Sequence, residues 1–399
     1  MMRGINTTVR RLRRKVFEEV AALGFKADAD TLCDDMEAIP YALVNDETEQ
    51  YRDSVYRARA VVREQVRLAM GLALRPEDKP VHLTAGVEAS NISDKYYEPP
   101  LMQVIPSACM RCEAKGYEVS NMCKGCLAHP CMEVCPKKAI SLDRVTGKSI
   151  IDQDACIKCG RCATVCSYNA IIVQERPCAK ACGMKAITSD ENGKATIDYD
   201  KCVSCGMCLV NCPFGAISDK SQIYQVIKAI QSGEKVYAAV APAFVGQFGP
   251  KVTPEKLRAA MKELGFADVL EVAIGADLCA KQEAEDFLKE VPEELPFMAT
   301  SCCPAWSVMA KKLFPEYAEV RPGAPELITN DQGWISTVIS KVHKSPMSRI
   351  RTTQADIRNI DTLKAHGYQK GKQKKLAGNF NLVRRTTDPQ TIYVKNALN

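Results

Sequence analysis

The pattern of hydrophobic and polar positions changes character several times along this chain of 399 residues. In the first part, residues 51–72 (YRDSVYRARAVVREQVRLAMGL) place small and branched apolar residues at helical spacing, with Arg and Glu between them. The apolar face consists of Val55, Ala58, Val62, Val66 and Ala69. This spacing predicts an amphipathic helix that ends near Gly71, and we expect residues 1–105 to form a mostly helical N-terminal region.

Residues 220–320 alternate between helix and strand patterns. Gln222–Gln231 predicts a helix, and the apolar run Val236–Val240 predicts a buried strand. Thr253 fits the N-cap of a second helix because a proline follows it at the first helical position. Val269–Ile274 predicts another strand before a further helix. Strands that alternate with helices predict an α/β domain.

Residues 106–219 contain an internal repeat. The stretch CMEVCPKKAISLDRVTGKSIIDQDACIKCGRCATVCSYNAI (131–171) matches CAKACGMKAITSDENGKATIDYDKCVSCGMCLVNCPFGAI (178–217) in its order of cysteines, acids and Ala-Ile pairs. Each copy predicts short strands and tight cysteine loops without a long helix. The chain therefore predicts an α+β multidomain protein: a helical N-terminal region, a repeated cysteine-rich part and an α/β part.

Composition and charge indicate where in the cell the protein is expected and which kinds of partner it is expected to bind. The hydrophobic content of 46% fits a protein with real cores, and no apolar run reaches the length of a membrane span. The start, MMRGINTTVRRLRRKVFEEV, is too polar for a secretory signal peptide, so we expect a cytoplasmic protein without membrane contact. Residues 321–399 hold 14 Lys and Arg against 5 Asp and Glu, a net of +9 within an overall +6. A solvated tail explains this charge better than a nucleic-acid site.

The cysteines point to metal chemistry. Sixteen of the 20 cysteines lie between Cys109 and Cys212. In a reducing cytosol, such clusters are metal ligands more often than disulfides. Cys33 stands alone and is expected to be a small buried apolar residue.

Two motifs have the C-x2-C-x2-C-x3-C spacing of bacterial ferredoxins, in which three thiolates hold one 4Fe-4S cubane and the last goes to a neighbouring cubane. They are Cys156, Cys159, Cys162, Cys166 and Cys202, Cys205, Cys208, Cys212. A close variant consists of Cys123, Cys126, Cys131 and Cys135. The second repeat keeps only Cys178 and Cys182 in its first half, and we expect Cys109 and Cys112 to be the missing pair.

We therefore predict a polyferredoxin domain with four 4Fe-4S sites over residues 106–219. The sets are Cys123, Cys126, Cys131 with Cys166; Cys156, Cys159, Cys162 with Cys135; Cys202, Cys205, Cys208 with Cys182; and Cys109, Cys112, Cys178 with Cys212. A nested pairing of the motifs stays open. Structural zinc on the C-x2-C pairs is the alternative, although zinc does not need four thiolates within eleven residues. His129 fits a spacer between cysteines better than a ligand.

The segment TSCCPAW at Thr300–Trp306 resembles the first signature of the iron-only (FeFe) hydrogenase catalytic domain. The segments APA (241–243), GADL (275–278) and FPEY (314–317) agree with it. With a polyferredoxin in front, residues 1–320 resemble a monomeric FeFe hydrogenase, and residues 220–320 resemble the N-terminal part of its H-cluster domain.

The resemblance implies roles for six residues. Cys303 would ligate the 4Fe-4S part of the active-site H-cluster, and Cys302 would hand protons to its di-iron part. Glu283 would be the next acid of the proton path, and Asp286 stands where the family usually has Glu. Without the family, two acids on one helix face indicate a solvated surface. Ala241 and Pro242 would line the cofactor pocket, or would simply end a strand.

The resemblance is incomplete. The family's MPC-x2-K signature and its Gly-rich C-x3-C supply three further H-cluster thiolates, and no cysteine follows Cys303. We therefore expect no assembled H-cluster and no activity, with a non-catalytic polyferredoxin carrier or interaction protein as the alternative. A ferredoxin or other redox protein is the expected partner, with hydrogenase maturation proteins for an intact relative. Residues 321–399, a basic tail without an assigned fold, are expected to be foreign to the family, by truncation or chimerism after about residue 320.

Overall fold

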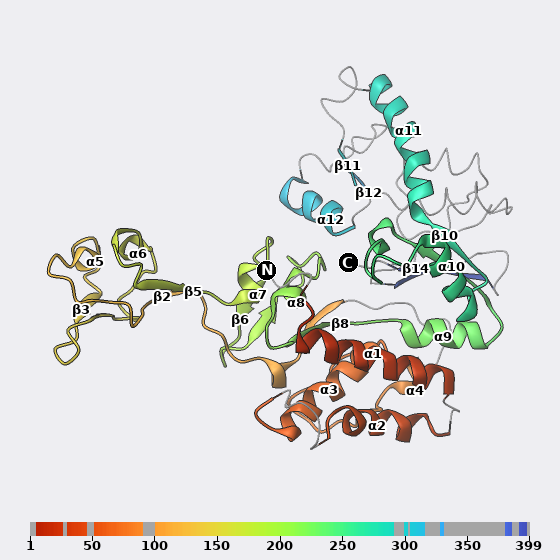
Figure 1. The fold of residues 1–399 in the computed structure, drawn as a ribbon, viewed down its shortest axis with the longest axis horizontal. Helices are drawn as coiled ribbons and strands as arrows, with labels where there is room; N and C mark the ends of the chain where they lie inside the picture. The colour runs from red at the N-terminus through yellow and green to blue at the C-terminus, as the bar shows by residue number, and fades with distance from the viewer. Residues whose placement is uncertain are drawn as a thin grey trace. The chain divides into compact units, whose positions relative to one another are not determined.

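The computed structural model describes residues 5–26, 30–45, 52–90, 100–290, 299–301, 304–315, 328–330, 380–384 and 391–396. Helices and strands are mixed along the chain (Figure 1). The chain divides into two compact units, of which one, the cysteine-rich unit, holds residues 108–202 and 207–217. Most of the remaining chain belongs to the second unit. No helix within the described ranges is long and apolar enough to cross a membrane.

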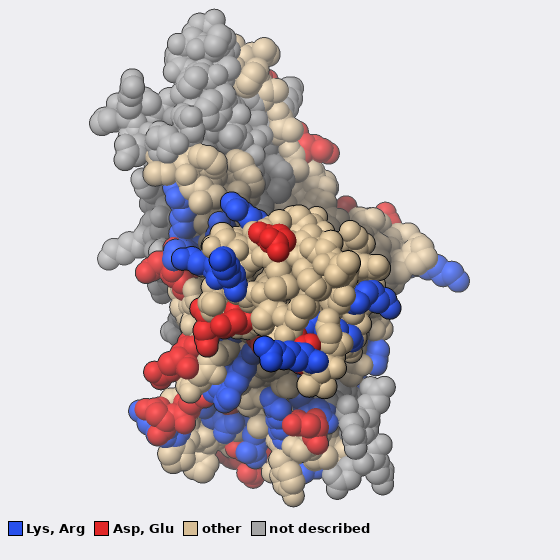
Figure 2. Space-filling view, turned by 90° about the vertical axis from the view of Figure 1, so that its left-hand side faces the viewer, with Lys and Arg blue, Asp and Glu red and all other residues tan. Residues whose placement is uncertain are grey.

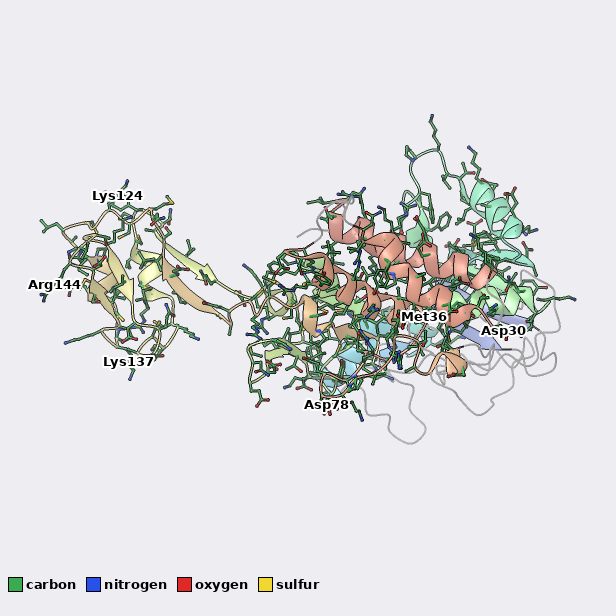
Figure 3. The ribbon with its side chains drawn as sticks, turned by 90° about the horizontal axis from the view of Figure 1, so that it is seen from below. Asp30, Met36, Asp78, Lys124, Lys137 and Arg144 are labelled. Carbon is green, nitrogen blue, oxygen red and sulfur yellow. The ribbon has the colours of Figure 1, made fainter. Side chains whose placement is uncertain are left out.

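Four helices form the N-terminal part of the second unit. They are α1 (Thr8–Lys26), α2 (Leu32–Leu43), α3 (Val55–Ala69) and α4 (Val87–Ser90). Val20, Met36 and Val62 are fully buried in their common core, and Figure 3 labels Met36 within this bundle. Tyr224 of α9 (Ile223–Gln231) belongs to the same core, so the predicted helix at 222–231 closes the bundle.

Helix α3 confirms the helix predicted within residues 51–72. It begins at Val55 because Ser54 caps it: the Ser54 hydroxyl accepts a hydrogen bond from the Arg57 amide at 3.2 Å. The predicted apolar face is buried, with Val55 packed at its margin. Gly71 adopts a left-handed φ of 78° just after the end of the helix, as a stop signal requires.

The expectation for Cys33 is wrong, because its side chain is exposed. The buried positions of α2 include Leu32, Met36 and Ile39. Consecutive residues of an α-helix point about 100° apart. Cys33 therefore turns away from the face that Leu32 buries.

The cysteine-rich unit is built from short antiparallel hairpins and single-turn helices, as the repeat predicted. The inner module (residues 116–174) contains β2 (Gly116–Val119), α5 (Pro130–Glu133), β3 (Ile140–Leu142), β4 (Ser149–Ile151), α6 (Arg161–Val165) and β5 (Ile171–Gln174). Strand β3 pairs with β4, and β5 returns antiparallel to β2. The module therefore begins and ends on one pair of strands.

The outer module consists of residues 108–112, 176–202 and 207–217. It contains α7 (Pro177–Lys180), β6 (Ile187–Ser189), β7 (Ala195–Ile197) and α8 (Met207–Asn211), with β6 antiparallel to β7. Strand β8 (Ile217–Asp219) then pairs with β1 (Met102–Val104), which precedes the short 3-10 turn η1 (Pro106–Ala108). In chain order, the inner module is thus inserted between Cys112 and Arg176. This insertion explains why the Cys109–Cys112 pair stands so far ahead of its repeat.

A mixed sheet with the order β10-β9-β14-β13 forms the α/β part. Its strands are β9 (Lys235–Val240), β10 (Asp268–Glu271), β13 (Phe380–Arg384) and β14 (Thr391–Asn396). Helix α10 (Pro254–Glu263) precedes β10, and the Thr253 side chain caps it as predicted. Strand β9 ends at Val240, and the short 3-10 turn η2 (Pro242–Phe244) follows it.

The strand predicted over Val269–Ile274 is wrong in its last three residues. Strand β10 stops at Glu271, and α11 (Val272–Glu290) begins immediately. The register explains the stop: Glu271 pairs with Val240, the last residue of β9, so the chain has no partner strand beyond it. A short apolar run cannot by itself distinguish a strand from a buried helix.

Segments of the tail pair with this part of the chain. Strand β14 lies parallel to β9, and β13 lies antiparallel to β14. Strand β12 (Ile328–Asn330) pairs with β11 (Ala299–Ser301), which precedes α12 (Pro304–Leu313). The tail, for which we predicted no fold, therefore supplies strands, and β9 is paired on both sides, with β10 and β14.

Candidate iron–sulfur sites

The inner module has two pockets, and each is lined by four cysteines that the sequence analysis grouped. The first is lined by Cys135, Cys156, Cys159 and Cys162. The second is lined by Cys123, Cys126, Cys131 and Cys166. In both pockets the fourth cysteine comes from the other motif, which is the exchange that the ferredoxin spacing produces.

The outer module has a corresponding pocket. It is lined by Cys109, Cys112, Cys178 and Cys212. This is the last of the four sets predicted from the sequence. The inserted inner module accounts for the long stretch of chain between Cys112 and Cys178. The structure thus brings these four side chains together, and their role as cluster ligands stays a prediction.

For Cys202, Cys205, Cys208 and Cys182, the structure gives local geometry only. Burial, followed by the nearby Cys202 and Cys208, raises the pKa of Tyr199. The Cys182 sulfur accepts a hydrogen bond from the Ala186 amide at 3.3 Å. Their grouping as one site therefore stays a prediction too.

One feature recurs at the last cysteine of every motif. The amide four residues later donates a hydrogen bond to its Sγ at 3.3–3.4 Å, and the donor is always a buried alanine. The pairs are Ala139 to Cys135, Ala170 to Cys166, Ala186 to Cys182 and Ala216 to Cys212. A buried isoleucine follows each alanine and begins a strand. The repeated Ala-Ile pairs thus place an amide on a cysteine sulfur and begin the strand that follows it.

The backbone bends in the same way at each cysteine loop. The residue just before the second cysteine of the first C-x2-C pair in each loop has a left-handed φ: Arg111, Gly125, Lys158 and Ser204. So does the third residue after each last cysteine: Lys138, Asn169, Lys185 and Gly215. For an L-residue this conformation costs roughly 1–2 kcal/mol. Its recurrence at equivalent positions indicates a common loop shape that the sites require.

Two glycines are fixed by close packing as well as by their φ. A Cβ on Gly160 (φ 80°) would collide with the hydroxyl of the buried Tyr117, which lines the same pocket. A Cβ on Gly125 (φ 59°) would collide with the carbonyl oxygen of Gly147. These contacts hold the cysteine loops against the rest of the inner module.

The thiols influence one another electrostatically. Burial, followed by Cys212, raises the pKa of Cys178 to about 11. Burial, followed by Cys109 and Cys212, raises the pKa of Cys112. Burial also raises the pKa of Cys162, and Cys156 with Cys159 adds to this.

The raised pKa values and the four-cysteine lining bear on whether a 4Fe-4S cluster fits these pockets. Four thiolates in one partly buried pocket repel each other unless a positive charge compensates them. A four-thiolate set with amide donors on its sulfurs matches the ligand chemistry of a 4Fe-4S cubane. Among the described residues, no three His, Cys, Asp or Glu side chains lie close enough together to ligate a single metal ion.

The residues taken from the hydrogenase resemblance are only partly described. Ala241, half-buried, caps η2, and Pro242, its first residue, is exposed at the carboxyl end of β9. Glu283 and Asp286 belong to α11, but their side chains lie outside the described residues. Cys302 and Cys303 also lie outside them, between β11 and α12 in the sequence. Their predicted roles are therefore not tested by the geometry.

The inner module carries exposed basic side chains, along with exposed acids such as Glu133 and Asp154. The exposed basic residues are Lys124, Lys137, Lys138, Arg144, Lys158 and Arg161. Lys124 lines the Cys123 pocket, and Lys137 and Arg161 line the Cys135 pocket. Figure 3 shows Lys124, Lys137 and Arg144 pointing outward from the module. In Figure 2, where this part faces the viewer, side chains of Lys and Arg appear together with side chains of Asp and Glu.

Comparison with protein families agrees with this division of the chain. Residues 122–170 match a 4Fe-4S dicluster domain, and residues 195–218 match a 4Fe-4S binding domain. Residues 234–321 match the C-terminal domain of the iron only hydrogenase large subunit.

Three curated proteins are similar over parts of the chain. Iron hydrogenase 1 of Clostridium pasteurianum is 36% identical over 176 residues, which cover 42% of this chain and 30% of that protein. The NADP-reducing hydrogenase subunit HndD of Solidesulfovibrio fructosivorans is 30% identical over 192 residues, 44% of this chain and 32% of HndD. The electron transport protein HydN of Escherichia coli is 38% identical over 71 residues, 17% of this chain and 39% of HydN. The chain thus spans about a third of the length of each hydrogenase.

Proposed function

For a chain that carries 4Fe-4S domains and is related to iron-only hydrogenases, we propose a function as a multi-cluster electron-transfer protein with four 4Fe-4S sites. The observation that carries the proposal is the gathering of three predicted cysteine sets around three pockets. A fourth set, Cys182 with Cys202, Cys205 and Cys208, follows from the same spacing and the same alanine-to-sulfur hydrogen bond.

Residues around these sites would adjust the reduction potentials of the clusters and shield the clusters from water. A 4Fe-4S cubane, when bound, supplies one-electron redox chemistry. The amides of Ala139, Ala170, Ala186 and Ala216 stabilise negative charge on the sulfurs and so favour reduction. Burial of Cys131, Cys162, Cys178 and Cys208 limits access of water to one side of each site.

An acidic redox protein, such as a ferredoxin, is the proposed partner. Cys159 is exposed, and the basic residues Lys137 and Arg161 lie beside it in the same pocket. Opposite charges accelerate encounter between two proteins and orient them. The similarity of HydN, an electron transport protein, supports the same class of function.

Hydrogen chemistry is the second candidate function, and the match of residues 234–321 to the hydrogenase domain favours it. By the resemblance, Cys303 would bind the cubane of an H-cluster, Cys302, Glu283 and Asp286 would carry protons, and Ala241 with Pro242 would line the pocket. A cubane needs four thiolates, and of the four H-cluster thiolates that the resemblance implies, this chain has a match only for Cys303. We therefore expect no hydrogen turnover by the chain on its own.

The proposal also concerns the origin of the tail, residues 321–399, for which there are two explanations. The hydrogenase match ends at residue 321, which supports a junction with sequence foreign to the family. The pairing of β14 with β9 instead supports a tail that completes the sheet in its own way. Reading the DNA beyond codon 320 in all frames distinguishes them: an MPC-type signature in another frame supports a broken gene.

Electron transfer to an acidic ferredoxin tests the main proposal. The reconstituted chain, reduced by a dye, should reduce the ferredoxin, and added salt should slow the reaction. A variant with Lys124→Glu, Lys137→Glu and Arg161→Glu should be slower by about tenfold or more at low salt. Lys15→Glu, at an exposed position of α1, is the matched control and should leave the rate unchanged. Failure of the reduced chain to transfer electrons would contradict the proposed function. Equal rates for the triple variant and for Lys15→Glu would contradict docking of the ferredoxin at Lys124, Lys137 and Arg161.

A further inference from the structure

Arg176 is a buried arginine beside one of the candidate cluster sites. Its exposed fraction is 4%, and it lies at the N-cap of α7, two residues before Cys178. Arginine is almost never fully buried unless it is paired. Neither motif spacing nor hydrophobic pattern distinguishes it from an ordinary surface arginine.

The guanidinium group joins three segments of the outer module. Its Nε and Nη2 donate hydrogen bonds to the carbonyl oxygen of Cys112 at 2.9 and 2.6 Å. Its Nη1 donates to the Thr188 carbonyl in β6, and its Nη2 also donates to the Gly193 carbonyl in the following turn, both at 2.8 Å. Arg176 therefore holds the Cys109–Cys112 loop against the β6–β7 hairpin.

The hydrogen bonds of Arg176 satisfy its donors but do not neutralise its charge. All acceptors are main-chain carbonyls, and no carboxylate within the described part of the chain pairs with it. A buried charge is costly unless an opposite charge accompanies it. Arg176 lines the same pocket as Cys109, Cys112, Cys178 and Cys212. A cubane with four thiolates is a net anion whose charge grows on reduction, so it would be the missing counter-ion.

The charge of Arg176 lies close to the cysteines. Two of its nitrogens donate to the Cys112 carbonyl oxygen at 2.9 and 2.6 Å, and its side chain lines the pocket that all four cysteines share. A cation that stabilises a thiolate also stabilises the more negative, reduced state of a cluster that the thiolate binds.

The inner module offers an internal comparison. Helices α5 and α7 both begin with Pro-Cys, at Pro130-Cys131 and Pro177-Cys178, so His129 stands in the position of Arg176. His129 has a φ of 40°, and its buried Nδ1 has no hydrogen-bond partner. The two related pockets therefore differ in their buried cation: the outer pocket is lined by the buried Arg176, whereas the lysine that lines the inner pocket, Lys124, is exposed to solvent.

We propose that Arg176 is a positioning residue and the built-in counter-cation of the cluster site formed by Cys109, Cys112, Cys178 and Cys212, and that it raises the reduction potential of this one cluster. The inference rests on the proposed 4Fe-4S function. It makes the outer site a better electron acceptor than the related inner site, which His129 accompanies.

The test is an EPR-monitored redox titration of the full-length, reconstituted chain. The signal of the outer site is identified by its loss in Cys178→Ser. Arg176→Gln should shift the midpoint potential of that signal to more negative values and leave the others unchanged. Arg176→Lys, which keeps the charge, should stay closer to wild type. Arg111→Gln also removes one positive charge, from the Cys109–Cys112 loop that Arg176 binds, but Arg111 is exposed, so this change should cause a much smaller shift.

An unchanged potential in an Arg176→Gln protein with full iron content would overturn the proposal. If Arg176→Gln loses the cluster, Arg176→Lys decides: a retained signal supports the need for a cation, and its loss there as well overturns the electrostatic role. Absence of the assigned signal from the wild-type chain would instead count against the proposed function.

Discussion

The backbone amide of Ala195 donates a hydrogen bond to the Sγ atom of Cys109 at 3.3 Å, although 86 residues separate them in the chain. Ala195 begins β7, so this bond anchors the Cys109–Cys112 loop to the hairpin of the outer module. Together with the Arg176 hydrogen bonds to Cys112, it assigns the loop to the pocket of Cys178.

This relationship predicts that Cys109→Ser and Cys178→Ser remove the same single cluster, since both side chains line one pocket. Reduced-state EPR of the two variants should show the loss of one common signal. Cys131→Ser is the matched control, because its side chain lines a different pocket, and it should remove a different signal. Two different losses from the first two variants would disprove the pairing.

Gly160→Ala should destabilise the holoprotein more than Gly206→Ala. Both glycines have a left-handed φ, 80° and 75°, so each substitution should cost roughly 1–2 kcal/mol. Only Gly160 faces the Tyr117 hydroxyl, and this crowding should add about 1–3 kcal/mol, because a Cβ at Gly206 meets open space.

Anaerobic denaturant unfolding measures the difference. Tyr117→Phe, combined with Gly160→Ala, should restore part of the lost stability by removing the nearest colliding atom. Equal destabilisation by the two glycine substitutions would show that the contact with Tyr117 does not matter.

Removal of iron should unfold the inner module and spare the N-terminal helices. The buried core of the module consists of Tyr117, Cys131, Ile140, Cys162 and Ile171. Two of these are cysteines, and so small a core needs its metal to be stable. The bundle of α1, α2 and α3 has a much larger apolar core of its own.

Limited trypsin digestion before and after anaerobic chelation checks this expectation. New cleavage should appear within residues 115–174, and a fragment containing residues 5–90 should persist. A module that stays resistant without iron would mean that its protein contacts alone hold it together.

The sequence predicted which cysteines line a common pocket better than it predicted their surroundings, and their role as cluster ligands stays a prediction. Cysteine spacing grouped Cys109 with Cys178 because the repeat left a pair missing, and the pocket agrees. Spacing could not predict the burial of Arg176, because its partners are carbonyls that only the folded hairpin brings to it. The feature of the sequence that could have drawn attention to Arg176 is its alignment with His129. Each of the two residues precedes a Pro-Cys pair in its copy of the repeat.

Local patterns failed where tertiary contacts decide. Val272 continues an apolar run that fits a strand, but β9 ends at Val240 and offers no partner, so the chain turns into a helix. Cys33 was expected to be buried from its residue type, and its position next to Leu32 on α2 turns it outward. The left-handed Lys158 is likewise set by its cysteine loop and not by any preference of lysine.

The chain should produce no hydrogen, even when coexpressed with maturation enzymes. By the resemblance, Cys303 is one of four thiolates that an H-cluster requires, and no other cysteine follows it. The measurement is hydrogen evolution from reduced methyl viologen, with Cys303→Ala as the control. Turnover well above the control would refute the expectation and require ligands from another chain.

Quantification of iron, acid-labile sulfide and zinc in the anaerobically reconstituted chain tests the central claim most directly. Four cubanes predict about 16 iron atoms and an equal amount of sulfide for each chain, with zinc near zero. A variant that combines Cys109→Ser and Cys178→Ser should lose about four iron atoms, since both belong to one site. About half the expected iron in the wild type, or stoichiometric zinc, would contradict the account.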